Sequence, residues 1–400
     1  MEDLTRRGML ASAAAVVWCW PAADRPALPG AAASFRLPPP EPGAGTTPFF
    51  KTGFLDHDPP LGYAHCPSIA ALSDGRLACC WYAGSREGGR DVGIWMAESD
   101  PAGLAGDAIA WGAPRVLVDR QTATRELDRF IDKVGNPIIF TDADGRLWLV
   151  YVSIAVGGWS GSSLNARCSP DGGATWGRSR RLTLSPFFNI SELVRAAPVL
   201  LESGEIGLPV YHECIGKFPE MLWLRPEGDR LTAAKSRMAG GRSLLQPAVV
   251  PLEARRAVAF LRNHSRRHRL VSQQTADGGH TWSEPVETAL PNPDASVAAI
   301  RLSGGEVLVA FNNSPHGRDN LSLAVSPDGL HDWRLIATLD DEPDQKFAYP
   351  FLTRDSAGLV HLVYSWKMKR IRHAAMNEAW LRAQQPGRLL AQRLPPEPRP

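Results

Sequence analysis

One eight-residue phrase occurs three times in this chain. It reads SPDGGATW at residues 169–176, TADGGHTW at 275–282 and SPDGLHDW at 326–333. The Asp of each phrase can accept hydrogen bonds from the backbone of its own turn, and the Gly supplies a positive φ. The closing Trp begins a new strand and packs its indole against a neighbour. Each phrase therefore predicts a corner between two β-strands, and three copies of it predict a repeat architecture.

A second pattern marks six units, each an apolar run, a tight polar turn and another apolar run. This pattern is typical of two antiparallel strands. The units begin at Pro67, Pro137, Pro198, Pro247, Ser296 and Pro350. Strands do not alternate with helical segments, which argues against a TIM barrel or a Rossmann fold. Six units of about four strands each predict an all-β fold, a six-bladed β-propeller.

The two ends of the chain differ in composition from its middle. Arg6 and Arg7 precede a short apolar run, and Ala31–Ala33 offers small residues for cleavage. We therefore expect residues 1–33 to be a signal peptide of the twin-arginine type, and the protein to be periplasmic or secreted. Residues 34–55 are rich in Pro and Gly and are expected to form a linker or an extended first segment. The propeller then covers residues 56–384, and residues 385–400 form a tail rich in Pro and Arg.

Charge and cysteine content limit the partners. The formal net charge of the 400 residues is only +2, so nothing points to nucleic acid or a membrane surface. The apolar run near the start is too short to span a bilayer. Outside the expected signal the cysteines have no CxxC spacing, so they predict buried thiols rather than a disulfide framework or a zinc site. We expect a monomer with no cofactor and no metal.

Polar and aromatic residues occur at the strand ends that are expected to lie on one side of the propeller. Successive strands of a blade are antiparallel, so the start of the first strand and the end of the second lie on the same side. Six blades bring six such pairs around one mouth. The candidate residues at this mouth are His65, Asn136, Arg195, Gln246 and Tyr349 at strand starts, and His212, Glu213, Arg262 and Arg318 at or after strand ends. Because Arg grips planar carboxylates, the mouth is expected to bind an acidic glycan.

Over nearly all of residues 50–380, these repeats resemble the sialidase (neuraminidase) superfamily, in particular its bacterial group with BNR or Asp-box repeats. The resemblance implies three arginines that hold the substrate carboxylate, a Tyr nucleophile activated by a Glu, and an Asp as acid/base. Arg262 in FLRNHS and Arg318 in HGRDN match two of the arginines. Tyr349 in FAYPFL matches the nucleophile, and Asp91 in GGRDVGIW is expected to be the acid/base.

Three positions depart from the family pattern. His65 in HCP replaces the first arginine, and Ser365 replaces the Glu that braces that arginine. Gln246 stands close to where the family has the Glu that activates the tyrosine. His212 or Glu213 is expected to serve as the base instead. If His65 binds the substrate carboxylate, it must do so as imidazolium.

The resemblance implies an exported glycoside hydrolase of the exo-α-sialidase type, which releases a terminal acidic sugar from glycans. Two alternatives remain open. One is a polysaccharide lyase on chains that contain uronic acid, and the other is a carbohydrate-binding propeller without catalysis. A product with a new C=C bond indicates the lyase, a free reducing sugar indicates the hydrolase, and neither product indicates the binding protein.

Overall fold

The computed structural model describes residues 33–38, 47–55, 62–100, 109–184, 191–387 and 389. The twin-arginine signal expected over residues 1–33 lies outside these residues apart from its last position. Most of the tail expected over residues 385–400 lies outside them as well. Among the residues that are described, no helix has both the length and the apolar character needed to cross a membrane.

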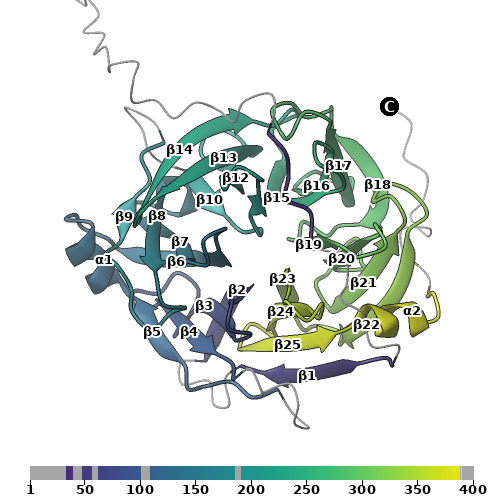
Figure 1. Cartoon of the computed structure of the whole chain (residues 1–400), viewed down its shortest axis with the longest axis horizontal. Coiled ribbons are helices and arrows are strands. Elements are labelled where there is room, and N and C mark those ends of the chain that lie inside the picture. The colour runs from purple at the N-terminus through teal and green to yellow at the C-terminus, as the bar shows by residue number, and fades with distance from the viewer. Residues whose placement is uncertain are drawn as a thin grey trace, which may run out of the picture.

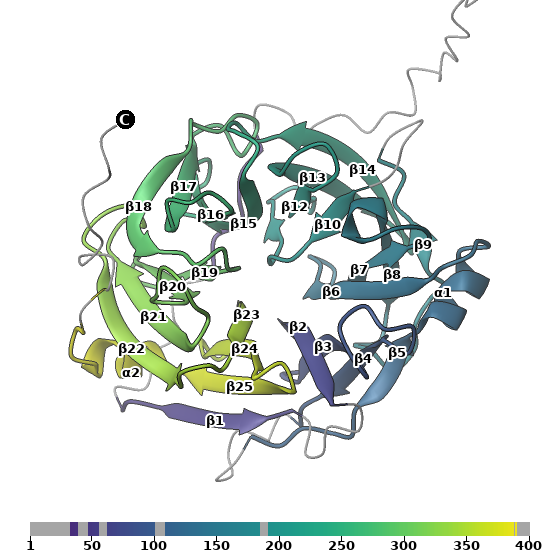
Figure 2. The same cartoon turned by 180° about the vertical axis from the view of Figure 1, so that it is seen from behind.

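Six antiparallel sheets stand around a common centre and confirm the six-bladed propeller (Figures 1 and 2). Sheet 1 contains β2 (Tyr63–Ala71), β3 (Leu77–Gly84), β4 (Gly93–Glu98) and β5 (Arg115–Val118). Sheet 2 contains β6 (Lys133–Thr141), β7 (Leu147–Ile154), β8 (Ser162–Ser169) and β9 (Arg180–Arg181). Sheet 3 contains β10 (Glu192–Val194), β11 (Val199–Leu200), β12 (Ile206–His212), β13 (Phe218–Glu227) and β14 (Arg230–Arg237).

The remaining sheets complete the ring. Sheet 4 contains β15 (Leu244–Pro251), β16 (Ala257–Asn263), β17 (Arg269–Thr275) and β18 (Val286–Pro291). Sheet 5 contains β19 (Ala298–Arg301), β20 (Val307–Phe311), β21 (Asn320–Ser326) and β22 (Arg334–Asp341). Sheet 6 contains β23 (Phe347–Arg354), β24 (Val360–Trp366), β25 (Arg370–Met376) and β1 (Phe50–Phe54). The helices within the described residues are α1 (Arg120–Glu126) and α2 (Glu378–Ala383), and a 3₁₀ turn lies at Trp159–Gly161.

The core lies between neighbouring blades. Strands β3 and β7 are buried along their whole length, because each sheet packs another sheet on both of its faces. One apolar cluster joins side chains of sheets 1, 2, 3 and 6, among them Trp81, Trp148 and Val363. Propeller blades thus read as nearly continuous apolar runs, which is why the six units stand out in the sequence.

The segment expected to be a linker belongs to the propeller. Strand β1 pairs with β25 from Phe50–Met376 to Phe54–Arg372, so it forms the outermost strand of sheet 6. Earlier in the chain, Phe35 is buried and forms an isolated bridge with Leu201 of sheet 3. The expectation that the propeller starts only at residue 56 is therefore wrong, because backbone pairing extends it toward the N-terminus.

The three Asp-containing turns join the third and fourth strands of sheets 2, 4 and 5. In the first, the Asp171 carboxylate accepts hydrogen bonds from Thr175 N at 2.8 Å and from Thr175 Oγ1 at 2.6 Å. In the second, Asp277 accepts the same two bonds from Thr281 at 3.0 and 2.6 Å. In the third, where Asp332 stands at the position of the threonine, the preceding His331 contacts the turn Asp, with its ring Nδ1 2.8 Å from Asp328 Oδ2. These turns lie at the outer end of each sheet, as the sequence predicts.

Candidate functional site

Four innermost strands share one irregularity near their first residues. The pairing register shifts between His65 and Ser68 in sheet 1, and the same shift occurs in sheets 2, 4 and 6. At each shift, the residue before a proline has a left-handed φ, 51° at Cys66, 43° at Asn136, 51° at Gln246 and 56° at Tyr349. Such backbone is disfavoured for residues other than glycine, and bulges of this kind often re-aim a side chain next to an active site.

All four bulge residues line one pocket at the mouth of the propeller. The pocket is a hollow of about 340 Å³ that is open to solvent. Its walls come from five of the six sheets and consist of Cys66, Tyr82, Glu87, Asn136, Trp159, Leu193, Tyr211, Glu213, Gln246, Arg262 and Tyr349. Five of the sequence-predicted site residues are among them. The other five, His65, Asp91, Arg195, His212 and Arg318, do not line it.

Arg262 is held rigidly in the pocket wall. Its Nε donates to Asp294 Oδ1 at 2.6 Å, and its Nη1 donates to Gln246 Oε1 at 3.4 Å. The second oxygen of Asp294 lies 2.8 Å from His264 Nδ1. Burial acts to lower the pKa of Arg262, but the hydrogen bond that it donates to Asp294, together with the nearby acidic groups, outweighs burial and raises the pKa. The guanidinium is therefore a fixed positive charge that faces the pocket.

Two further arginines flank Tyr349. The guanidinium carbons of Arg195 and Arg318 lie 5.1 and 5.7 Å from the centre of the tyrosine ring. Arg195 is only 2 % exposed, and its Nη2 donates to the backbone oxygens of Tyr349 and Pro350. Arg318 Nη2 donates to the backbone oxygen of Asp294 at 2.6 Å. Arg195 thus acts as a positioning residue that holds the bulge of Tyr349, and the Arg318 guanidinium lies over the ring.

The BNR repeat-like domain family matches residues 75–362, which is well over half of the chain. The chain belongs to this family. No curated protein shows a significant match to this BNR propeller.

Solved structures share the fold of this BNR propeller at low identity. A protein of unknown function from Dyadobacter fermentans is 14% identical, with a TM-score of 0.65 over 82% of this chain and 98% of that one. The Hadza microbial sialidase Hz136 is 18% identical, with a TM-score of 0.64 over 78% and 65%. The intramolecular trans-sialidase from Ruminococcus gnavus is 14% identical, with a TM-score of 0.64 over 86% and 99%.

His65 does not face the pocket of this BNR propeller. It is 2 % exposed, its Nδ1 lies 2.8 Å from Ser365 Oγ, and its ring packs edge-on against Tyr349 at 4.5 Å. Burial lowers the pKa of His65 well below its usual value, and the positive charges of Arg195, Arg318 and Lys346 lower it further. The expectation that His65 binds a carboxylate as imidazolium is therefore wrong, because the folded protein keeps it neutral. The neighbouring residue Cys66 lines the pocket in its place.

Asp91 lies on the expected loop but turns away from the pocket. It is exposed, and its carboxylate accepts hydrogen bonds from Ser85 N at 2.7 Å and Ser85 Oγ at 2.9 Å. The backbone and hydroxyl hydrogen bonds of Ser85 lower the pKa of Asp91, which makes it a poor proton donor near neutral pH. Asp91 closes the loop, and Glu87 of the same loop lines the pocket instead.

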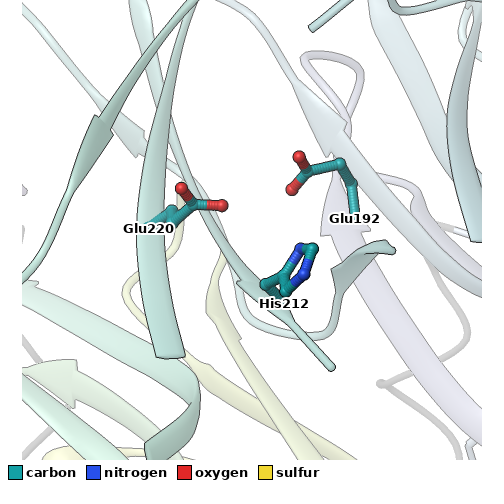
Figure 3. Close-up of side chains that lie close together, drawn as sticks. All are labelled: Glu192, His212 and Glu220. Carbon is teal, nitrogen blue, oxygen red and sulfur yellow. The ribbon is translucent and has the colours of Figure 1, made fainter. Parts of the chain in front are cut away.

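His212 and Glu213 lie on opposite sides of one strand end. Glu213 and Tyr211 line the pocket, so the alternation of a strand points His212 to the other face. The ring of His212 stacks on Phe218 at 4.7 Å, and burial lowers its pKa. On that face His212 lies close to Glu192 and Glu220 (Figure 3). Glu213 remains a candidate base, and the prediction that His212 serves the pocket is wrong.

Three aromatic residues complete the pocket of this BNR propeller. Tyr82 and Tyr211 stand near the ends of β3 and β12, and Gln246 Nε2 donates to the hydroxyl of Tyr211 at 3.1 Å. Trp159 comes from the 3₁₀ turn after β7 and packs against Gly135, where an added Cβ would lie 2.9 Å from the indole. Strand alternation around Glu213 signals Tyr211 in the sequence, whereas no local pattern signals Trp159.

Proposed function

We propose that this BNR propeller is an exported glycosidase of the exo-α-sialidase type, which releases a terminal acidic sugar from glycans. The observation that carries this proposal is the setting of Tyr349, which lines a pocket with Arg262 and lies under two further guanidinium groups. The same pocket holds two carboxylate side chains, Glu87 and Glu213. A hydroxyl nucleophile, fixed positive charge and carboxylates are the groups that such a hydrolysis needs.

The binding step follows from the charges and shape of the pocket. The carboxylate of the sugar pairs with Arg262, and the Arg318 guanidinium lies over the ring of Tyr349. The amide of Asn136 offers hydrogen bonds to sugar hydroxyls, and Trp159 offers an apolar face to the ring. A hollow of about 340 Å³ is in the usual size range for one small ligand.

The catalytic step gives a role to each carboxylate. Tyr349 Oη attacks the anomeric carbon while the bond to the leaving oxygen breaks. Glu213 accepts the phenolic proton, and Glu87, an exposed carboxyl group in the pocket wall, donates a proton to the leaving oxygen. Water then attacks the tyrosyl-linked sugar, Glu87 accepts its proton, and Tyr349 recovers its own from Glu213.

The test uses the purified protein with aryl glycosides of several acidic sugars, sialosides and uronides among them. Release of the aryl alcohol and a free reducing sugar supports the proposal. Tyr349→Phe should reduce the rate by at least about 100-fold, since it removes the nucleophile. Wild-type turnover that Tyr349→Phe leaves unchanged would place the chemistry elsewhere.

A polysaccharide lyase is the second candidate, and Gln246 favours it. The amide of Gln246 stands near the position where the family has a carboxylate, and a neutral His65 packs against Tyr349. An amide can hydrogen-bond a uronate carboxylate without repelling it, and Tyr349 can then act as base. Ultraviolet absorbance of a new C=C bond with uronate-containing chains identifies this reaction. Binding of acidic sugars without either product identifies a carbohydrate-binding propeller.

Export by the twin-arginine route is part of the same proposal, because Arg6 and Arg7 precede the apolar run of the expected signal. Replacing both arginines with lysine should retain the precursor in the cytoplasm. Fractionation of cells that express the two forms measures this, and normal export of the double variant would contradict the proposed route.

A further inference from the structure

Sheet 3 carries a buried cluster of two glutamates and one histidine behind the pocket. The three residues are Glu192 of β10, His212 of β12 and Glu220 of β13 (Figure 3). Glu192 pairs with His212 in the strand register, and His212 pairs with Phe218, two residues before Glu220. This register places all three side chains on one face of the sheet. One ligand atom from each lies within 4.8 Å of the others.

Two buried carboxylates of this cluster share one ammonium group. Glu192 is 3% exposed and Glu220 is 6% exposed. Lys235 Nζ lies 2.7 Å from Glu192 Oε1 and 3.4 Å from Glu220 Oε2, so one ammonium group serves two carboxylates. The other nearby cation, Arg237, stacks on the Phe218 ring at 3.8 Å. A buried carboxylate without full compensation is unfavourable, and an added cation would relieve it.

A second observation points to a missing ligand. Within the described part of the chain, Glu192 Oε2 is buried and accepts no hydrogen bond, and the contact of Glu220 Oε2 with Lys235 Nζ at 3.4 Å is an ion pair without hydrogen-bond geometry. Buried carboxylate oxygens almost always have a partner. In Figure 3 the carboxylate of Glu192 points toward Glu220 and the ring of His212.

We propose that Glu192, His212 and Glu220 bind a divalent transition-metal ion of the zinc type. Two carboxylates and one imidazole form a mixed oxygen and nitrogen set, which zinc accepts at about 2.0–2.2 Å, with a fourth position open to water. Ligand atoms already within 4.8 Å need only small side-chain rotations to reach such distances. The ion would take the place of the Lys235 ammonium group, which moves toward solvent.

This ion would brace the strand end that serves the pocket. His212 lies between Tyr211 and Glu213, which both line the pocket. The backbone N of Glu213 donates to Ser191 Oγ at 2.9 Å, and Ser191 directly precedes Glu192. A metal ion bound to His212 on one face of the sheet would therefore fix Tyr211 and Glu213, which project from the opposite face into the pocket. The inference concerns metal binding alone and does not depend on the reaction in the pocket.

The experiment measures zinc binding by titration calorimetry to the full chain, purified without a histidine tag and treated with a chelator. We expect one zinc ion per chain and a rise in the melting temperature. Glu220→Gln and, separately, His212→Asn should weaken binding at least tenfold. Glu205→Gln is the matched control, because Glu205 directly precedes β12 of the same sheet but pairs with Arg225 at 2.6 Å outside the cluster. Titrations with manganese and with calcium in place of zinc compare the affinities of the three ions. Weaker binding of these two ions is expected, because an imidazole ligand favours zinc.

A second variant keeps the test informative if the ligand variants fold poorly. Lys235→Gln removes the competing ammonium group and should tighten zinc binding at least tenfold, while circular dichroism checks the fold. Two results would overturn the proposal. One is the absence of zinc binding in both the wild type and Lys235→Gln, which would mean that the ammonium and a shared proton fill the cluster. The other is binding that Glu220→Gln, His212→Asn and the control weaken equally, which would place the ion elsewhere.

Discussion

At the scale of single residues, the pocket depends on backbone that most side chains avoid. Tyr349 has a φ of 56° and is followed by Pro350. A residue held in such a conformation costs about 1–3 kcal/mol and persists only when its surroundings hold it there. The buried guanidinium of Arg195 provides this support through the backbone oxygens of Tyr349 and Pro350. The strain places the tyrosine side chain in the pocket instead of along the strand.

The first prediction concerns the charge that faces the ligand. Arg262→Ala should weaken binding of an acidic sugar by about 2–4 kcal/mol, because it removes one side of a charged pair and leaves Asp294 without its partner. Titration calorimetry with a sialoside or a uronide measures the change. Arg255→Ala, an exposed arginine at the far end of the same sheet, is the control and should leave affinity unchanged. Equal losses in both variants would show that overall charge, and not this contact, attracts the ligand.

At the scale of elements, the Asp-containing turns stabilise the outer hairpin of a blade. Asp277 joins the two ends of its turn through Thr275 Oγ1 at 2.8 Å and through the hydroxyl and backbone N of Thr281. Trp282 Nε1 closes the corner by donating to Gly279 O at 3.2 Å. These contacts lie within eight residues, so the eight-residue phrase itself supplies the hydrogen bonds that define the turn.

The second prediction follows from those contacts. Asp277→Ala should lower the free energy of unfolding by about 1–2 kcal/mol, since several turn hydrogen bonds are lost. Ligand binding in the pocket should not change. Urea unfolding measures the loss, and Glu284→Ala, an exposed neighbour outside the turn, should stay within about 0.5 kcal/mol of the wild type. An equal loss in the two variants would mean that the turn hydrogen bonds contribute nothing specific.

At the scale of the whole molecule, the ring closes between sheets 6 and 1. Strand β1 completes sheet 6, and a buried chain of hydrogen bonds crosses to sheet 1. Trp111 Nε1 donates to His373 Nδ1 at 3.3 Å, His373 Nε2 lies 3.1 Å from His361 Nδ1, and His361 Nε2 lies 3.1 Å from Asp355 Oδ2. With each imidazole neutral, every group in this chain has one donor facing one acceptor. An added proton on His373 would point at the Trp111 N–H.

The third prediction is a loss of stability in mild acid. Burial, with His361 beside it, lowers the pKa of His373 well below its usual value. The unfolded chain takes up a proton near pH 6.5, while the folded chain does not. Stability is therefore full above about pH 6.5 and falls as the pH drops toward the folded pKa, by about 1–2 kcal/mol for this residue between pH 7 and pH 5.

Melting temperatures across that range test this prediction. His373→Asn should reduce the slope of melting temperature against pH, even if it lowers stability at every pH. His316→Asn, which changes an exposed histidine, should leave the slope as it is. An unchanged slope in His373→Asn would show that the acid sensitivity arises elsewhere, for instance at His65, which burial also holds neutral.

The sequence by itself determined the repeats, the six blades and the outer turns, because strand pairs and turn hydrogen bonds involve residues that are close in the chain. It also pointed to Tyr349, Arg262, Gln246, Asn136 and Glu213, since a strand end in a propeller faces the mouth. Only the tertiary structure decided which of several residues close in the sequence lines the pocket. Cys66 lines it and His65 does not, and Glu87 lines it and Asp91 does not. A bulge or a loop contact can turn a side chain to the opposite face of the sheet, and the burial of a residue depends on all the blades together. Neither the direction nor the burial of a side chain can therefore be deduced from a local sequence pattern. For the same reason the pairing of Glu192, His212 and Glu220 emerged only in the folded sheet.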